Sequence, residues 1–212
     1  MATYESVIKI TGAVGDLVFY TLNGKNVVRK KSGFNKAAFK KNPSYEKVRQ
    51  NSSEFGHCSK MGKMIRKSLE VYIKEAGDPL LYQKFAKVMT AIKDLDTISE
   101  RGKRTVENGL KTEEGRKLLR DFQWGTVRKV SDGVRMEDQI LYKNDHCTSE
   151  HALIMTMKLD AENYNIESNE EIVHWNQQQD KSFKKYFSED DILIYFVALK
   201  NENDKITHMG FV

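Results

Sequence analysis

Cysteine and proline are scarce in this sequence, which contains two of each among its 212 residues. Cys58 and Cys147 are far apart, and a single pair of this kind is not the disulfide framework of a small secreted domain. No apolar run approaches the roughly 18 residues that a membrane-spanning helix needs. The first ten residues lack the basic and then apolar segments of a signal peptide. We therefore expect cytoplasmic synthesis and no membrane span, with incorporation into a particle or export by a dedicated machine left open.

Charge is distributed unevenly along the chain. Residues 1–130 contain 27 Lys and Arg against 14 Asp and Glu, whereas the remaining residues contain 8 against 16. This asymmetry predicts a basic domain of hairpin and helices at 1–124 and an acidic, β-rich domain at 125–212. A basic half needs either nucleic acid or an acidic protein surface as its partner, and that surface can belong to the same chain or to a neighbouring copy. The alternative is that these charges only form a well-solvated surface.

The strongest local signal is a β-hairpin centred on Asn23-Gly24. These two residues readily adopt the positive φ angles of a type I′ turn, and the flanking runs are rich in β-branched and aromatic residues. A two-residue turn fixes the strand register, which predicts these opposing pairs: Leu22 and Lys25, Tyr20 and Val27, Phe19 and Val28, Val18 and Arg29. Because both faces of the hairpin are apolar, we expect it to join a sheet, either the C-terminal one or that of a neighbouring copy.

Helical signals follow the hairpin. Residues 5–11 alternate like a short strand before it, and 32–42 form a basic linker after it. Apolar residues at helical spacing then predict helices, and turn and capping residues place their ends. We expect one helix to begin at Asn42-Pro43 and to run through Tyr72, either packing tightly along its small residues or breaking near Gly56–Gly62. Two more helices are expected to start at Asp78-Pro79 and Thr112, the last one ending near Phe122, with turns at 99–104 and at Asn108-Gly109.

After Trp124 the sequence changes to short strand-like runs separated by turn-prone residues, a spacing typical of an antiparallel sheet. The run Ile192–Ala198 is apolar throughout and is expected to be the central strand. The other expected strands are Gly125–Val130, Gln139–Tyr142, Ala152–Met157, Glu171–Trp175 and Ile206–Val212. The expected fold class is therefore α+β, with an N-terminal β-hairpin, an antiparallel helical layer and a C-terminal antiparallel β domain.

No motif in the sequence indicates catalysis, a metal site or a cofactor. His57-Cys58 and the cluster at 146–151 contain zinc-ligand residue types without the paired spacing of zinc sites. Cys58 or Cys147 could pair with His151 or His174 as a nucleophile and base, but no local signature accompanies them. We expect a protein that is not an enzyme, with no cofactor and no metal.

One pattern remains that suggests function, a basic stretch after the hairpin that contains Phe34 and Phe39. Lysine and arginine neutralise phosphates and aromatic rings stack on bases, so this pattern is compatible with nucleic-acid binding without sequence preference. The alternative is a solvated linker whose phenylalanines are buried in the core. The candidate nucleic-acid-binding residues are Lys30, Lys31, Lys36, Lys40 and Lys41, together with Arg101, Lys103 and Arg104 from the basic turn at 99–104.

A series of residues near the N-terminus resembles an uncharacterised bacterial family: Gly12-x-Val14-Gly15-x-x-Val18-x-Tyr20, then Gly24-Lys25-x-Val27-Val28-Arg29, then Asn42-Pro43, Arg49 and Phe55. Members of that family open with a glycine-flanked hairpin, and several are encoded near phage-like or mobile-element genes. The resemblance implies a non-enzymatic structural or assembly protein, a component of a phage-like particle or surface assembly. We expect such a protein to form a homo-oligomer or to bind an assembly partner. The alternative function is sequence-nonspecific nucleic-acid binding.

The sharpest prediction from the sequence concerns Arg29, which shares a face of the hairpin with Tyr20 and Val27. An arginine on an apolar face is costly unless it reaches a carboxylate, and the acidic half can supply one. We expect a structural ion pair. Arg29→Lys should weaken the fold or the assembly, and Arg29→Ala should cost about 2–5 kcal/mol if the pair is buried. Thermal melting and light scattering measure both effects; loss of nucleic-acid binding alone would contradict the ion pair.

Overall fold

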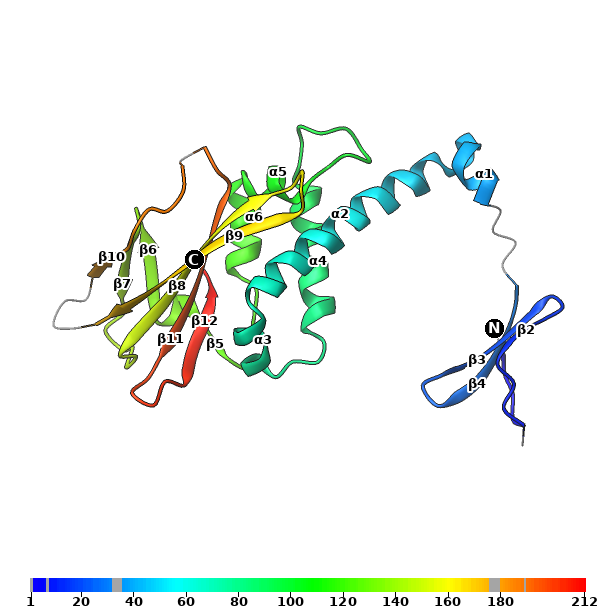
Figure 1. Cartoon of the computed structure of the whole chain (residues 1–212), viewed down its shortest axis with the longest axis horizontal. Coiled ribbons are helices and arrows are strands. Elements are labelled where there is room, and N and C mark those ends of the chain that lie inside the picture. Colours follow the sequence, from blue (N-terminus) through cyan, green and yellow to red (C-terminus); the bar gives the residue numbers. More distant parts are fainter. Residues whose placement is uncertain (1, 7, 32–35, 176–179, 189) are drawn as a thin grey trace. The chain divides into compact units, whose positions relative to one another are not determined.

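The computed structural model describes residues 2–6, 8–31, 36–175, 180–188 and 190–212, and the chain forms two compact units, 1–46 and 47–212 (Figure 1). The protein is α+β, with an N-terminal strand hairpin and a strand-rich C-terminal region, as the sequence predicts. Among the described residues no helix combines the length and apolarity needed to cross a bilayer.

The first unit is a small antiparallel sheet followed by helical turns. Its elements are β1 (Ala2–Thr3), β2 (Gly12–Val14), β3 (Leu17–Leu22), β4 (Lys25–Lys30), the helix α1 (Lys36–Lys41) and a 3₁₀ turn at Pro43–Tyr45. The strand order is β1-β4-β3-β2. The predicted hairpin register is confirmed for all four pairs, and Asn23 and Gly24 adopt φ angles of 50° and 77°.

One prediction about this unit is wrong. Residues 5–11 do not form the expected strand in their described part; β1 and β2 lie on either side of them. Of the two sheets that the hairpin was expected to join, the C-terminal one does not contain it, because β1 and β2 complete a sheet of its own. The sheet of a neighbouring copy stays a prediction. The basic linker expected at 32–42 contains α1, and its residues 32–35 lie outside the described residues.

The second unit begins with helices. They are α2 (Glu46–Ser68, whose first residue belongs to the first unit), α3 (Glu70–Ala76), α4 (Leu81–Asp94), α5 (Val106–Leu110) and α6 (Glu113–Arg120). Asn42 caps the turn before α2 by accepting a hydrogen bond from the Ser44 amide, and Thr112 caps α6 in the same way through the Gly115 amide. The expected turn at Asn108-Gly109 is wrong, because both residues lie within α5.

The long predicted helix passes through its glycines without a break and ends at Ser68, one turn before Tyr72. Gly62 is buried against Met89 and Phe85 of α4, so the small residue there permits close packing between the helices. Gly56, by contrast, has open space around its α carbon. Gly77 then ends α3 in the left-handed conformation, which a glycine adopts without strain.

Two sheets complete the second unit. The larger has the order β5-β12-β11-β8-β9 and is antiparallel except where β5 pairs with β12; the smaller has the order β10-β7-β6. Their strands are β5 (Arg128–Lys129), β6 (Val134–Glu137), β7 (Ile140–Lys143), β8 (His151–Asp160), β9 (Asn165–His174), β10 (Asp180–Ser182), β11 (Leu193–Lys200) and β12 (Ile206–Phe211). The prediction that Ile192–Ala198 forms the central strand is confirmed, because β11 lies in the middle of the five-stranded sheet. The sequence pattern missed β6 and β10.

The five-stranded sheet is buried on both faces, which gives the unit two cores. Along β8, Leu153 and Met155 pack toward the helices, whereas Ala152 and Ile154 pack in the second core with residues of the three-stranded sheet. Trp124 is fully buried in the helical core, where its ring lies 5.1–5.8 Å from those of Phe85, Phe122, Phe196 and Phe211. Helices and sheet therefore share one core, and the chain divides between residues 46 and 47 rather than at Trp124.

Gly109 and Gly56 provide a matched test of this packing. A β carbon on Gly109 would lie 1.9 Å from the Ile92 carbonyl oxygen, so Gly109→Ala must push α5 away from α4. We expect it to destabilise the protein by at least 2 kcal/mol, on the order of other severe core substitutions. Gly56→Ala meets no neighbour within 4 Å and should stabilise α2 by about 0.5–1 kcal/mol. Urea unfolding of both variants measures the difference; equal midpoints would contradict the close contact.

Candidate functional site

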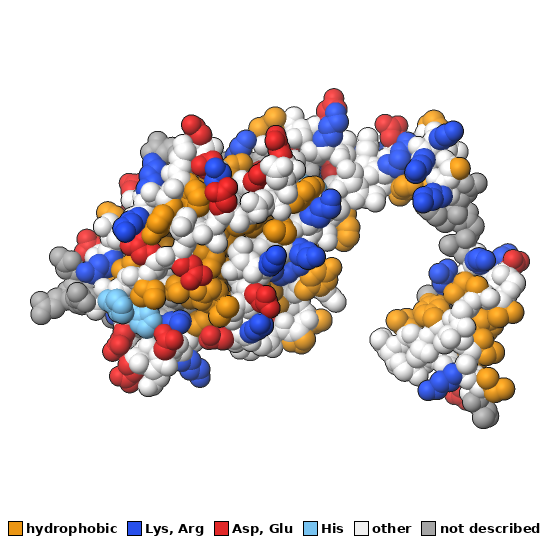
Figure 2. Space-filling view, viewed as in Figure 1, with side chains coloured by type: hydrophobic (Ala, Val, Ile, Leu, Met, Phe, Trp, Pro, Cys, Tyr) orange, Lys and Arg blue, Asp and Glu red, His pale blue; other side chains and the backbone are white. Residues whose placement is uncertain are grey.

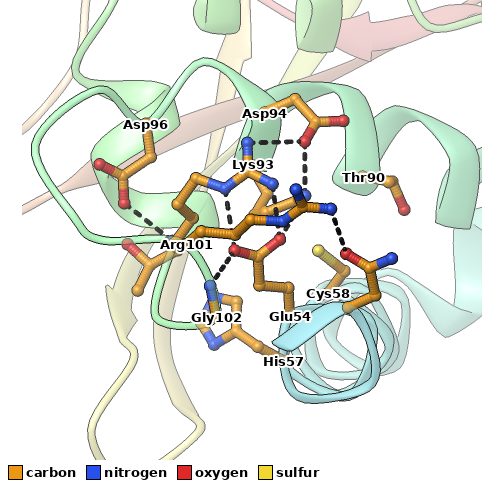
Figure 3. Close-up of polar contacts among 12 residues, drawn as sticks. Glu54, His57, Cys58, Thr90, Lys93, Asp94, Asp96, Arg101 and Gly102 are labelled. Atoms are coloured by element: carbon orange, nitrogen blue, oxygen red, sulfur yellow. Dashed lines mark hydrogen bonds and ion pairs between the residues drawn. The ribbon is translucent and has the colours of Figure 1, made fainter. Parts of the chain in front are cut away.

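Glu54 on α2 is the centre of a buried polar cluster in the second unit. It is only 2% exposed, yet it is charged and fully hydrogen-bonded (Figure 3). Lys93 Nζ of α4 lies 2.8 Å from Glu54 Oε2, and the Arg104 guanidinium donates to both oxygens at 2.8 and 2.7 Å. The Gly102 amide donates to Oε1 at 2.6 Å. Asp94 closes the cluster, 2.5 Å from Lys93 Nζ and 3.1 Å from Arg104 Nη1.

This arrangement perturbs the ionisation of its members. The Arg104 hydrogen bonds hold the pKa of the Glu54 carboxyl far below its ordinary value, against the opposing effect of burial. Burial lowers the pKa of Lys93, but its bonds to Asp94 and Glu54 outweigh burial and leave that pKa raised. The bond to Glu54 also raises the pKa of Arg104. All of these shifts favour the charged forms, so the cluster is a permanent set of ion pairs at neutral pH.

Asp96 holds the loop that presents Arg104. Its Oδ1 accepts hydrogen bonds from the amides of Ile98 and Ser99 at 3.0 and 2.9 Å, and its Oδ2 accepts from the Thr105 amide at 2.9 Å. Burial raises the pKa of Asp96, but these amide bonds dominate and hold it well below its ordinary range. The carboxylate of Asp96 therefore fixes both ends of the loop between α4 and α5.

The basic turn at 99–104 is thus engaged largely within the protein. Arg104 binds Glu54, and Arg101 donates to Asn51 Oδ1 at 3.1 Å. Lys103 lies 3.1 Å from Glu100 and remains exposed. Nothing in the sequence singled out Glu54, because a glutamate in a helix looks like ordinary surface until the fold brings Lys93 and Arg104 to it.

A second polar cluster lies beside the first, around His57. Its Nε2 accepts a hydrogen bond from the Val106 amide at 3.0 Å, and its Nδ1 lies 3.3 Å from the Tyr164 hydroxyl. The buried Glu107 carboxylate lies 3.2 Å from the same Nε2, and neither of its oxygens has a hydrogen-bond donor among the described residues. A proton on Nε2 would join His57 to Glu107 at the expense of the Val106 bond.

The two cysteines are buried and lie in different cores. The Cys58 thiol faces the Met89 carbonyl oxygen at 3.6 Å, and burial raises its pKa to about 11, which is unfavourable for a nucleophile. Cys147 lies 3.4 Å from Ser149 Oγ. The rings of His151 and His174 lie next to each other, with centroids 5.3 Å apart and a tilt of 39° between their planes. In the part of the chain that the structure describes, no three His, Cys, Asp or Glu side chains are grouped to hold one metal ion.

The first unit presents both charge and apolar surface (Figure 2). Val27 is the only fully buried hydrophobic residue among its described positions, and five others are 40–72% exposed: Ile8, Ile10, Val14, Leu17 and Leu22. The predicted basic residues Lys30, Lys31, Lys36, Lys40 and Lys41 are all exposed. Phe39 packs edge-on against Tyr45 at 5.8 Å, and Phe34 lies outside the described residues.

Arg29 is half-buried on β4, opposite Val18 as predicted. Its proposed ion pair with the acidic half stays a prediction. Comparison of the chain with protein-family models, curated proteins and solved structures finds no match. The resemblance to a bacterial assembly family likewise stays a prediction.

The Glu54 cluster predicts a measurable pH dependence. Because the pKa of Glu54 is lower in the folded protein than the ordinary value of 4.5, its stabilising effect is complete above that pH and is lost as the pH falls below it. Glu54→Gln leaves Lys93 without its buried partner and should cost about 3–5 kcal/mol at pH 7. Its deficit should shrink between pH 4.5 and pH 2.5.

The control is Glu100→Gln, which removes an exposed carboxylate from the same loop and should change stability by less than about 1 kcal/mol. Urea unfolding at several pH values measures both variants. A Glu54→Gln protein as stable as wild type at pH 7 would contradict the structural role of the cluster.

Proposed function

We propose that this protein is a non-enzymatic structural protein that assembles with copies of itself, through the apolar surface of its N-terminal sheet. The observation that carries the proposal is the exposure of Ile8, Ile10, Val14, Leu17 and Leu22 in a unit with one fully buried hydrophobic residue among its described positions. A small sheet requires a covered apolar face for stability. A partner that covers this surface would supply what the unit lacks.

Val14 and Leu17 form the centre of the proposed contact. They lie directly opposite each other on β2 and β3, so their side chains share one face of the sheet. They are 62% and 43% exposed. Complete burial of a side chain of this size stabilises by about 1.5–3 kcal/mol, and the exposed parts of the two together amount to about one such side chain, so covering the pair would contribute about 1.5–3 kcal/mol to association.

Charge supports a second copy as the partner. Residues 1–46 contain eight Lys and Arg against three Asp and Glu. In the second unit, β9 is an edge strand of the five-stranded sheet and carries Glu167, Glu170 and Glu171. Ile172 on the same strand is 57% exposed. An acidic edge with an exposed apolar residue is complementary to a basic sheet with exposed apolar residues, and edge strands accept additional strands readily. A particle or surface assembly of the phage-like kind would use such a contact repeatedly.

We expect wild-type protein to form oligomers that grow with concentration and loosen with salt, because salt screens the contact between basic and acidic surfaces. The double variant Val14→Ser, Leu17→Ser should shift the protein toward monomer by at least tenfold in dissociation constant. Multi-angle light scattering and sedimentation measure this after nuclease treatment, which removes any nucleic acid that bridges the lysines.

The matched control is Ile98→Ser, which removes an apolar side chain that is 76% exposed in the second unit. It should leave the oligomers intact. Wild-type protein that is monomeric at high concentration and low salt would overturn the proposal. Oligomers that disappear with nuclease would instead assign the exposed lysines to nucleic-acid binding, the alternative function.

A further inference from the structure

A cavity of about 800 Å³ opens in the second unit, between α6, the segment that leads into β6, and the adjoining ends of β11 and β12. Its floor is made of side chains from both cores. Leu119, Ile194 and Phe211 belong to the helical core, and Val130 and Val134 to the core on the other face of the sheet. All five are buried. The cavity therefore lies where the two apolar layers meet, and its lining combines these apolar side chains with polar and charged ones.

The rim of the cavity is basic. It carries five cationic side chains, against the two carboxylates of Asp121 and Asp191: Arg116, Lys117, Arg120, Arg135 and Lys185. Ion pairs engage part of this charge: Asp191 with Lys158 at 2.9 Å, Arg120 with Glu113, and Arg135 with Glu137 at 3.5 Å. With these partners included, six cations face four carboxylates. Arg116 uses its Nε to bind the Leu110 carbonyl oxygen at 3.0 Å, which orients the guanidinium. The net field at the opening thus favours an anion.

A neutral polar group lies among these cations. Tyr195 lines the cavity together with Gln139. Burial raises the pKa of Tyr195, so the phenol keeps its proton at neutral pH. A phenol in this state can donate a hydrogen bond to an anionic oxygen.

We propose that this cavity binds an organic anion with an apolar body, namely an alkyl or aryl chain that ends in a phosphate or carboxylate. The volume lies within the range of small-molecule sites, which combine an apolar lining with a few polar groups. The apolar part displaces water from the floor, and the charged head reaches the guanidinium and ammonium groups at the rim. Such a molecule is available either as a soluble amphiphile or as a membrane lipid.

Decyl phosphate, used below its micelle-forming concentration, tests the proposal by isothermal titration calorimetry on the full chain. We expect wild-type protein to bind it. Lys117→Gln combined with Arg135→Gln should weaken binding about tenfold, because two exposed cations of the rim are removed. Lys74→Gln combined with Lys103→Gln removes two equally exposed cations that do not line the cavity, and this control should bind like wild type. Melting temperatures of both double variants should stay unchanged.

Inorganic phosphate and decanol separate the contributions of head and chain, and each should bind much more weakly than decyl phosphate. Leu193→Trp, at a half-buried lining position, should fill the cavity and abolish binding. Equal affinity for inorganic phosphate, equal affinity for decanol, or full binding by Leu193→Trp would overturn the site.

Binding to phosphatidylcholine vesicles that contain phosphatidic acid, in addition to free decyl phosphate, would identify a lipid as the source. Binding of the free compound alone would identify a soluble amphiphile.

Discussion

The structure of the second unit depends on covering both faces of its five-stranded sheet. Along β8 and β11 the side chains on each face of the sheet are mostly apolar, so both faces must be shielded from water. The helices cover one face through an aromatic cluster centred on Trp124, and the three-stranded sheet contributes the cover of the other. This requirement explains why a charge boundary near Trp124 does not divide the structure: the basic helices and the acidic strands meet in one core.

The N-terminal sheet, by contrast, forms because of its local sequence more than its packing. Its local signals are strong, a type I′ turn and β-branched strands, but it buries little of its own apolar surface. Local propensity alone gives a sheet of this size marginal stability. The contrast between a doubly covered sheet and an uncovered one within a single chain is the physical basis for the proposal that the first unit contributes the apolar side of an assembly contact.

Short-range features of this fold were predictable from the sequence, and long-range ones were not. The hairpin register, the caps at Asn42 and Thr112 and the central position of β11 each follow from residues adjacent in sequence. The Glu54 cluster joins side chains 39 and 50 residues apart, and no periodicity signals it. The short strands β6 and β10 were missed because three or four residues are too few to show an alternating pattern. Asn108-Gly109 has the composition of a turn, but this glycine lies in α5 because the helix approaches Ile92 too closely for a side chain.

The placement of the two cysteines has a practical consequence. Cys58 lies in the helical core and Cys147 in the core on the opposite face of the sheet, and both are buried. A thiol reagent can modify each one only when its own core opens. The two labelling rates, separated by mass spectrometry of the peptides, therefore report the opening of the two layers independently. The native chain thus carries one chemical reporter for each core, without any engineered label.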